Sequence, residues 1–413
     1  MLNSHGSMLK NRVILFWLGA IVPLEFRFTN QATGFVSISI GEILVYGLFF
    51  YWLLKTKENQ SHGISSRALL PVILYCLWAI FSLAISPDII GFQVVRDVIT
   101  VSVFYSLLVS YITSYAGINR VLSGYCFGVI LNLAICLPQI VFDWPRPISL
   151  DVSGANLKEA LDGGANFSNV ATGLFAHPNG LAPHICIAIF LFIGFATSSS
   201  TVKSRLIACL AIAVSLLVLY FTFAKGALLW LSLGLATFFL RKFIPQRMRF
   251  TYTISTVTFV IFTIAFVVIP YLVEEGLGGT VQTRITLWGV LGDILGDDYW
   301  GAIVGGNQKA MLNISGFYSS FEYPDAHNTY LNQVVYFGFI GFALFSWFLI
   351  KSLKNIIFIN SSMYSKANVL WVIMSFLLGY IFFEPMHQGL SVLGLIYMFC
   401  GLAAAGANIS EIE

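Results

Sequence analysis

Long apolar stretches recur along the whole chain, and no other feature of the sequence limits its possible folds as strongly. Each stretch has about 20 residues, the length at which an α-helix crosses the hydrocarbon core of a bilayer with its backbone fully hydrogen-bonded. Only 10% of the residues are charged, whereas soluble proteins have about 25%. The sequence therefore predicts an all-α polytopic membrane protein with about 12 transmembrane helices, residues 1–413 forming a single integral membrane domain. The predicted spans cover residues 12–27, 35–54, 68–86, 97–115, 119–142, 180–198, 205–222, 225–240, 251–272, 329–350, 367–384 and 388–406.

Lysine and arginine gather in every second loop, which predicts the orientation of the chain. Cytoplasmic loops of membrane proteins carry an excess of these residues. The basic loops and both chain ends are therefore expected on the cytoplasmic side. The two long loops, residues 143–179 and 273–328, then face the outer side, and they hold most of the polar residues that could carry chemistry.

Ionisable side chains are sparse within the predicted spans. We find none in the middle of any span, and Glu42, His184 and Glu384 lie near the outer ends. Ion-coupled transporters commonly depend on ionisable groups inside the membrane, so this distribution argues against a transporter. The six cysteines all fall in apolar stretches without a CxxC pair, which is typical of small buried side chains rather than of disulfides or a metal site.

The second long loop contains the stretch RITLWGVLGDIL, residues 284–295. Its apolar residues, among them Ile285, Trp288 and Leu295, recur near helical spacing. Tryptophan is favoured at the boundary between lipid and water. We therefore expect a short helix that lies on the membrane interface and is anchored by Trp288.

A histidine and an asparagine lie where this loop meets the predicted span 329–350, in the sequence DAHNTYL. Asp325 is a good N-cap, and it predicts a helix that starts near Ala326 with His327 and Asn328 in its first turn. Free backbone N–H groups and the helix dipole at that position favour an anion and disfavour imidazolium. His327 would then stay neutral and act as a general base beside a bound phosphate. The alternative is a histidine that only lies at the end of a helix.

Basic residues on the outer side are few, and two of them occupy positions suited to an anionic ligand. Arg284 follows a glycine-rich turn, and a guanidinium binds phosphate through two parallel hydrogen bonds. Its alternative role is an anchor to lipid headgroups. Lys225 lies in the tight turn between the predicted spans 205–222 and 225–240. There it would either contact phosphate or extend its ammonium group to the interface.

The other polar residues do not predict a metal site. His177 and His184 are seven residues apart, but Pro183 intervenes and no third ligand accompanies them. Zinc sites need three or four ligands. The sequence therefore predicts neither a metal nor a cofactor. Gly338 and Gly341 are expected to be packing notches against a neighbouring helix.

In their order along the chain, these residues resemble the motifs of the O-antigen ligase and Wzy-type polysaccharide polymerase superfamily. The family's histidine–asparagine pair, with a following leucine and a GxxG-like notch, is matched by His327, Asn328, Leu331, Gly338 and Gly341. Its periplasmic arginine with a following aromatic residue is matched by Arg284 and Trp288. A further element before the sixth span is matched by Gly173, Phe175, Pro178 and Asn179. The family's (S/T)-R-(G/A)-x-L turn is matched by residues 224–228, with Lys225 in place of the usual arginine.

The resemblance implies a GT-C-like, metal-independent glycosyltransferase of the bacterial inner membrane, active on the periplasmic face. The donor would be a glycan on undecaprenyl pyrophosphate, and the acceptor a second saccharide. His327 would be the base on the acceptor hydroxyl, with Asn328 orienting it or the sugar. The leaving pyrophosphate would be stabilised first by Arg284, then by Lys225 and Arg146. Asn179 and Trp288 would complete the substrate-binding residues.

Within this family, a repeat-unit polymerase for O-antigen, capsule or exopolysaccharide and a ligase onto lipid A–core differ in their acceptor. The lysine at position 225 favours the polymerase. A chain-length regulator is a conceivable partner besides membrane lipid, and no nucleic acid is expected. The alternatives from other classes are a transporter or flippase for lipid-linked sugar and a non-enzymatic membrane scaffold.

Overall fold

The computed structural model describes most of the apolar part of the chain. The described residues are 2–24, 27–30, 35–56, 66–87, 89–142, 170–175, 178–264, 279–306, 328–357, 359, 364–383 and 393–412. Arg146, His177, Glu384 and His387, as well as Asp325 and His327, lie outside them.

α-Helices account for nearly all of the described residues. The helices are α1 (Leu2–Ala20), α2 (Ile40–Thr56), α3 (Ser66–Ile85), α4 (Ile89–Tyr111), α5 (Tyr115–Phe142), α7 (Pro178–Ser198), α8 (Val202–Tyr220), α9 (Lys225–Leu240), α10 (Arg249–Thr263), α12 (Gly279–Asp297), α13 (Tyr299–Val304), α15 (Thr329–Ile357), α16 (Tyr364–Phe383) and α17 (Gly394–Ile412). A 3₁₀ turn, η1 (Gln246–Met248), precedes α10. Each of the twelve predicted spans overlaps one of these helices.

Apolar length identifies this chain as a multi-pass membrane protein. Among the described residues, six helices are long and apolar enough to cross a bilayer: they cover Ala68–Ile85, Gly91–Tyr111, Tyr115–Phe142, Pro178–Ser198, Val202–Tyr220 and Thr329–Ile357. Four shorter apolar helices cover Ile40–Leu54, Lys225–Leu240, Ala367–Phe382 and Gly394–Ser410.

A small β-hairpin was not expected from the sequence. Strand β1 (Arg27–Asn30) pairs antiparallel with β2 (Phe35–Ser39), with Arg27 opposite Ser39. The predicted spans 12–27 and 35–54 had assigned part of this hairpin to helices. The sequence FVSIS of β2 alternates apolar and polar residues and contains β-branched side chains, which favour a strand.

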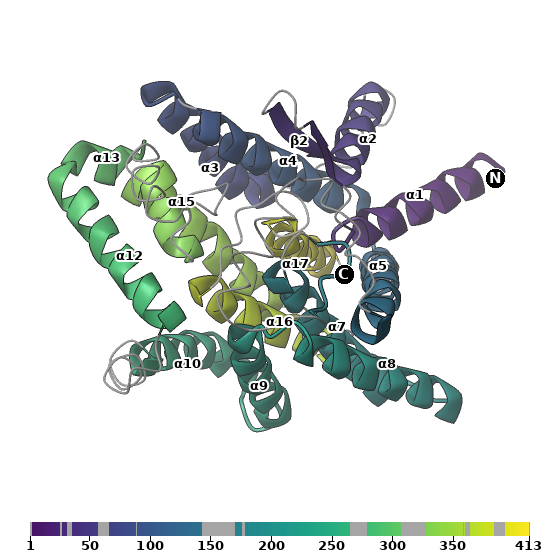
Figure 1. Ribbon diagram of the computed structural model, residues 1–413. Helices are drawn as coiled ribbons and strands as arrows, with labels where there is room; N and C mark the ends of the chain where they lie inside the picture. Colours follow the sequence, from purple (N-terminus) through teal and green to yellow (C-terminus); the bar gives the residue numbers. More distant parts are fainter. Residues whose placement is uncertain are drawn as a thin grey trace.

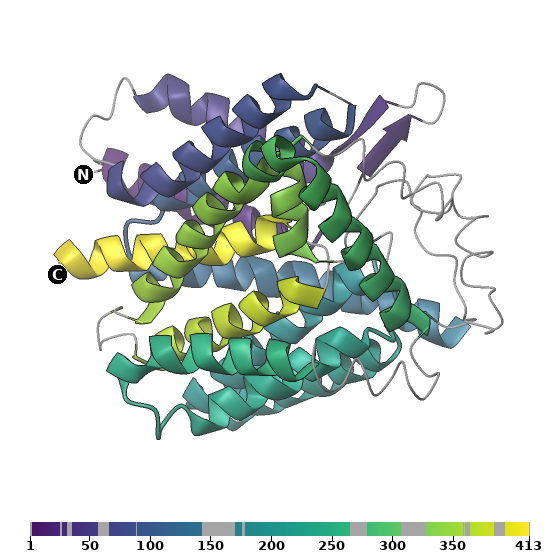
Figure 2. The ribbon, with the colours of Figure 1, turned by 90° about the vertical axis from the view of Figure 1, so that its left-hand side faces the viewer.

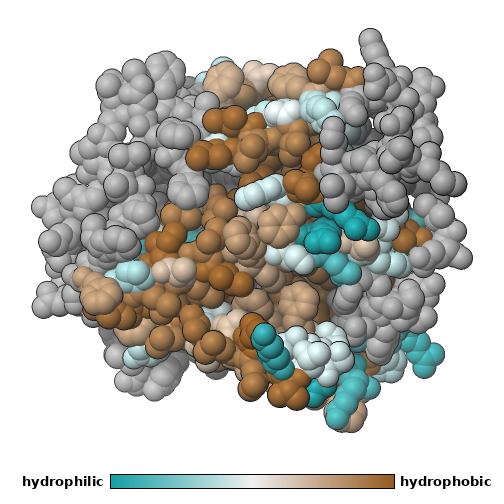
Figure 3. Space-filling model, turned by 90° about the vertical axis from the view of Figure 1, so that its right-hand side faces the viewer, coloured by the Kyte–Doolittle hydropathy of each residue, from teal (hydrophilic) through white to brown (hydrophobic). Residues whose placement is uncertain are grey.

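The helices run side by side, with α17 near the centre of the bundle (Figure 1). α17 is buried over almost its whole length, from Leu395 to Ala405. The start of α1 and the end of α17 lie at the same end of the bundle, and the β-hairpin lies at the opposite end, which we call the hairpin end (Figure 2). Apolar side chains cover the middle of the face formed by α1, α5 and α8 (Figure 3). α8 exposes Val202, Leu206 and Leu210 there, as expected for contact with lipid.

Helix α15 is broken at Gly338, whose φ of 68° and ψ of −178° lie outside the helical region. Carbonyl groups before the break accept hydrogen bonds from other elements. Ser82 Oγ donates to the oxygen of Tyr336 at 2.9 Å, and Trp78 Nε1 donates to that of Phe337 at 2.8 Å. The backbone N–H of Gly306 also donates to Tyr336, at 3.3 Å. These donors from α3 and from the end of α13 satisfy backbone groups that lipid could not.

Gly338 and Gly341 are therefore not equivalent packing notches. A Cβ atom at Gly338 would lie 2.2 Å from the carbonyl oxygen of Ile303 in α13, so this position does allow a close approach. The same residue also has a backbone conformation that only glycine adopts without strain. The prediction of a packing role was incomplete, because the break depends on partners in α3 and α13.

Replacing Gly338 with alanine should destabilise the protein by about 2–4 kcal/mol, because the substitution adds both a steric clash and backbone strain. Gly292→Ala in α12 is the matched control, since a Cβ atom there would meet nothing within 4 Å. The control should be neutral or more stable by up to about 1 kcal/mol. Thermal unfolding of both variants in detergent measures the difference. Equal melting temperatures would show that the break does not need glycine.

Candidate functional site

The N-terminus of α15 carries the pair that the sequence singled out, and it begins later than predicted. Asn328, not Asp325, is the N-cap: its side-chain Oδ1 accepts a hydrogen bond from the N–H of Leu331 at 3.1 Å, and the helix starts at Thr329. Asn328 is only 2% exposed. Its amide oxygen thus caps the helix, while its Nδ2 group can still donate to the histidine or a sugar, as predicted.

Helix α12 covers the stretch 284–295, where a helix was predicted, and Trp288 contacts another helix from it. Its ring packs edge-on against Phe382 of α16, with 5.9 Å between the ring centroids. Three residues later, Leu291 is buried against Val335 in the first part of α15. This side of α12 therefore faces the helical bundle.

Arg284 lies in α12 one helical turn before Trp288 and two turns before Leu291. Residues spaced by four and seven positions share one face of a helix. The backbone thus places Arg284 on the same face of α12 that packs against α15 and α16. The course of its side chain is outside the described part of the structure.

Aromatic contacts connect that face to the start of α15. Phe382 contacts Trp288 on one side and Tyr330 on the other, with ring centroids 5.9 Å and 6.3 Å apart. The hydroxyl of Tyr330 also donates to the carbonyl oxygen of Leu378 in α16, at 3.0 Å. One cluster of rings therefore joins α12, α15 and α16. Its member Tyr330 follows His327 by three positions in the sequence.

The turn before α9 holds Lys225 in a constrained conformation. Phe223 has a φ of 53°, which is unusual for a residue with a side chain. The N–H of Lys225 donates to the carbonyl oxygen of Phe223 at 2.9 Å, and Ala224 provides no side-chain cap for α9. The Lys225 side chain is exposed. An uncapped helix start with an exposed ammonium group is suited to an anion, as the sequence suggested.

Residues 170–175 form an irregular segment that is buried, and two amide side chains of α5 hold it. Gln139 Oε1 accepts from the N–H groups of Thr172 and Gly173 at 3.1 and 3.0 Å, while its Nε2 donates to the oxygen of Gly173. Asn132 Oδ1 accepts from the N–H of Leu174 at 2.9 Å. At the depth of the hydrocarbon, non-helical backbone needs either such partners or a water-filled cavity.

This clamp was missed by the sequence analysis, although the signal is visible: Asn132 and Gln139 are amides within the apolar stretch 119–142. The clamp fixes Gly173 and Phe175 just before α7. At the start of α7, the carbonyl oxygen of Asn179 accepts a hydrogen bond from the hydroxyl of Tyr380 in α16, at 3.0 Å. The element that carries Asn179 is thus tied to both α5 and α16.

Replacing Gln139 with leucine should lower the melting temperature and speed amide exchange at Thr172 and Gly173. Each buried N–H left without a partner costs about 1–3 kcal/mol. Gln93→Leu is the matched control, because no described group pairs with the buried Oε1 of Gln93. Hydrogen–deuterium exchange with peptide-level mass spectrometry measures the effect. Unchanged exchange in the Gln139 variant would contradict the clamp.

Two ionisable side chains lie within α4, although the sequence placed them at or before the start of a span. α4 starts at Ile89, so Arg96 and Asp97 fall inside the apolar stretch Gly91–Tyr111, in its first third. Arg96 donates to Asp97 at 2.7 Å and lies 3.8 Å from buried Glu42 of α2. The predicted span 97–115 began too late because Arg96 was assigned to the preceding loop, whereas α4 already begins at Ile89.

These charges belong to a polar seam between α2 and α4. Gln93, Arg96, Asp97 and Thr100 follow one another at the spacing of one helix face. The hydroxyl of Tyr46 in α2 lies 2.8 Å from Thr100 Oγ1. Opposite charges and hydrogen bonds within the seam offset the cost of placing ionisable groups in a membrane helix.

His184 is buried inside the bundle, where its Nδ1 lies 3.1 Å from the hydroxyl of Tyr125. Its ring also packs against Phe175. Within the described ranges, no three His, Cys, Asp or Glu side chains come together as metal ligands do. In this environment His184 stabilises the packing of α5 against α7.

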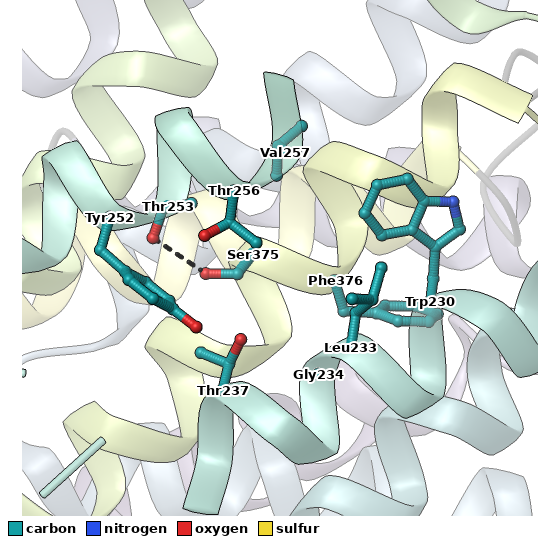
Figure 4. Close-up of a pocket in the computed structure, with 10 residues that line it drawn as sticks. All are labelled: Trp230, Leu233, Gly234, Thr237, Tyr252, Thr253, Thr256, Val257, Ser375 and Phe376. Atoms are coloured by element: carbon teal, nitrogen blue, oxygen red, sulfur yellow. Dashed lines mark hydrogen bonds between the residues drawn. The ribbon is translucent and has the colours of Figure 1, made fainter. Parts of the chain in front are cut away.

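A small pocket lies between α9, α10 and α16, and none of the predicted site residues lines it. Hydroxyl groups line one part of it (Figure 4), and Thr253 Oγ1 lies 3.2 Å from Ser375 Oγ. The other lining residues are mostly apolar, Trp230 and Phe376 among them, and no lining residue is charged. A pyrophosphate needs cationic partners, so this cavity does not suit the predicted donor.

Comparison of the chain with protein-family models and with curated proteins gives no match in either case.

Proposed function

We propose that this protein is a metal-independent glycosyltransferase that moves a glycan from undecaprenyl pyrophosphate to a saccharide acceptor. The observation that carries the proposal is the aromatic cluster of Trp288, Phe382 and Tyr330. It joins the face of α12 that includes Arg284 to the start of α15. His327 directly precedes Asn328, the residue that caps this helix. A general base and a phosphate-binding guanidinium on these two elements would act on the same substrate.

The reaction is a substitution at the anomeric carbon of the donor sugar. The oxygen of an acceptor hydroxyl forms the new bond to this carbon, and the bond to the pyrophosphate oxygen breaks. The electron pair leaves with the lipid pyrophosphate, and the hydroxyl proton passes to His327. Arg284 stabilises the charge that develops on the leaving group, with Lys225 and Arg146 as further cationic contacts.

The membrane arrangement belongs to the same proposal. Twelve spans place both chain ends on the cytoplasmic side of a bacterial inner membrane and the hairpin end in the periplasm. This arrangement is supported by the positions of the two chain ends, because α1 starts and α17 ends at the same end of the bundle (Figure 2). The GT-C-like character and the kinship with O-antigen ligases and Wzy-type polymerases remain part of this proposal, carried by the motifs in the sequence.

Among acceptors, we favour the growing polysaccharide, which makes the protein a repeat-unit polymerase. Lys225 keeps the positive charge of the family's arginine but loses its two-point geometry. A deletion strain separates the two activities. Single repeats attached to lipopolysaccharide indicate a lost polymerase, whereas an intact core without O-antigen indicates a lost ligase.

The polar seam reopens the question of transport, because Arg96, Asp97 and Glu42 supply the intramembrane charges that a transporter needs. The seam lies near the hairpin end of α2 and α4, and charged groups along a path through the whole bundle would be required for transport. Purified protein with lipid-linked glycan and acceptor distinguishes the two functions. Only a transferase lengthens the glycan without a membrane gradient.

His327→Ala and Arg284→Ala should each reduce glycan transfer by about 100-fold or more, because each removes a group that acts in the transition state. Both proteins should still insert and melt like the wild type. Arg247→Ala is the control, since Arg247 is an exposed arginine in η1, far along the chain from the site. Product length is measured with purified protein, and full activity of either site variant would refute the mechanism.

A further inference from the structure

Helix α13 presents two large aromatic side chains to its surroundings. Tyr299 is 77% exposed and Trp300 is 76% exposed, and Ile303 on the same short helix is 44% exposed. The opposite side of α13 is buried through Gly301 and Ala302. On a protein surface in water, a cluster of such exposed apolar side chains is rare unless it binds a partner.

The position of α13 along the bundle is fixed by its C-terminal end. Ser86 Oγ, just after α3, donates to the carbonyl oxygen of Gly306 at 3.1 Å. A Cβ atom at Gly305 would lie 2.4 Å from the oxygen of Tyr336. α13 is therefore held beside the last turn of α3, where an apolar helix long enough to cross the bilayer ends.

Apolar residues continue from α13 onto the neighbouring helices. Phe81 and Ile85 of α3 are 51% and 53% exposed, and Phe339 of α15, next to the break that contacts α13, is 54% exposed. On the other side, α12 exposes Asp293 and Asp297. Apolar side chains of α3 and α15 thus border α13 on one side, and the carboxylates of α12, which require water, precede it in the chain.

We propose that α13 is the interfacial anchor of the protein, with Tyr299 and Trp300 in the headgroup layer of the outer leaflet. Tryptophan and tyrosine favour this layer because each combines an apolar ring with a polar tip. The partner is a phospholipid surface, and the role assigned to Trp288 from the sequence belongs to these two residues. Only Asp298 separates α12 from α13, so the anchor also sets the height of α12 above the membrane.

An exposed aromatic pair could instead stack against a sugar in water. The apolar continuation onto Phe81, Ile85 and Phe339 favours lipid, because a saccharide platform would be ringed by polar groups. The anchor does not depend on the proposed enzyme activity, so its test needs no glycan.

The test compares tryptophan fluorescence of the wild type and Trp300→Phe in nanodiscs of phosphatidylglycerol and phosphatidylcholine. Subtracting the two spectra gives the emission of Trp300. A nitroxide near the headgroup should quench this emission at least twice as strongly as one near the end of the acyl chain. Trp371→Phe is the control, because Trp371 is fully buried in α16 and its emission should respond much less to either lipid label.

Two results would overturn the anchor. One is quenching of the Trp300 emission by aqueous iodide without quenching by either lipid label, which would put the ring in water and favour a sugar platform. The other is equal or stronger quenching by the deep label, which would place α13 inside the hydrocarbon core.

Discussion

Hydrocarbon offers no hydrogen bonds, and this constraint shapes two departures from regular helix in the described part of the protein. At Gly338 the backbone leaves the helical conformation, and Trp78, Ser82 and the N–H of Gly306 satisfy the carbonyl groups before the break. In the segment 170–175, Gln139 and Asn132 do the same for the N–H groups of three successive residues. Each irregularity therefore comes with partners from other helices, and these partners also fix its position.

The irregular backbone gathers around the start of α15 and the start of α7. The break at Gly338 separates the first part of α15, which carries the N-cap Asn328, from the long apolar remainder. The first part packs against α12 through Val335 and through the ring cluster around Phe382. A short helix held by neighbours on both sides is a rigid support for a catalytic group at its start, since rigid supports hold reacting groups in place.

Most helices could be predicted from the sequence, because hydrophobic length is a local property. The features that escaped prediction depend on residues far away in the chain. The start of α15 at Thr329 rests on the cap that Asn328 provides, and α4 begins at Ile89 with Arg96 inside it and not in a loop. Trp288 was assigned to the membrane interface because its spacing fits an interfacial helix. Its contact with Phe382 of α16 could not be predicted, because no local pattern in α12 reveals it.

In the candidate site, too, some residues could be recognised from local sequence and others only from contacts with distant residues. Residue types and their order suggested Arg284, Lys225 and the pair at the head of α15, whereas the amides of Asn132 and Gln139 became meaningful only through their contacts with residues 172–174. The hairpin between α1 and α2 was likewise hidden, because its strands lie between two strongly apolar stretches.

The central claim is that positions 284 and 327 approach each other around one ligand. It is tested most directly by introducing Arg284→Cys and His327→Cys together, in a background with the exposed Cys209→Ser, and adding a short thiol cross-linker. A second pair, Trp288→Cys with Phe382→Cys, marks a known contact and shows that the reagent works. The account predicts an intramolecular link between 284 and 327 that peptide mass spectrometry identifies. Linking of the contact pair alone, with both 284 and 327 labelled but unlinked, would contradict it.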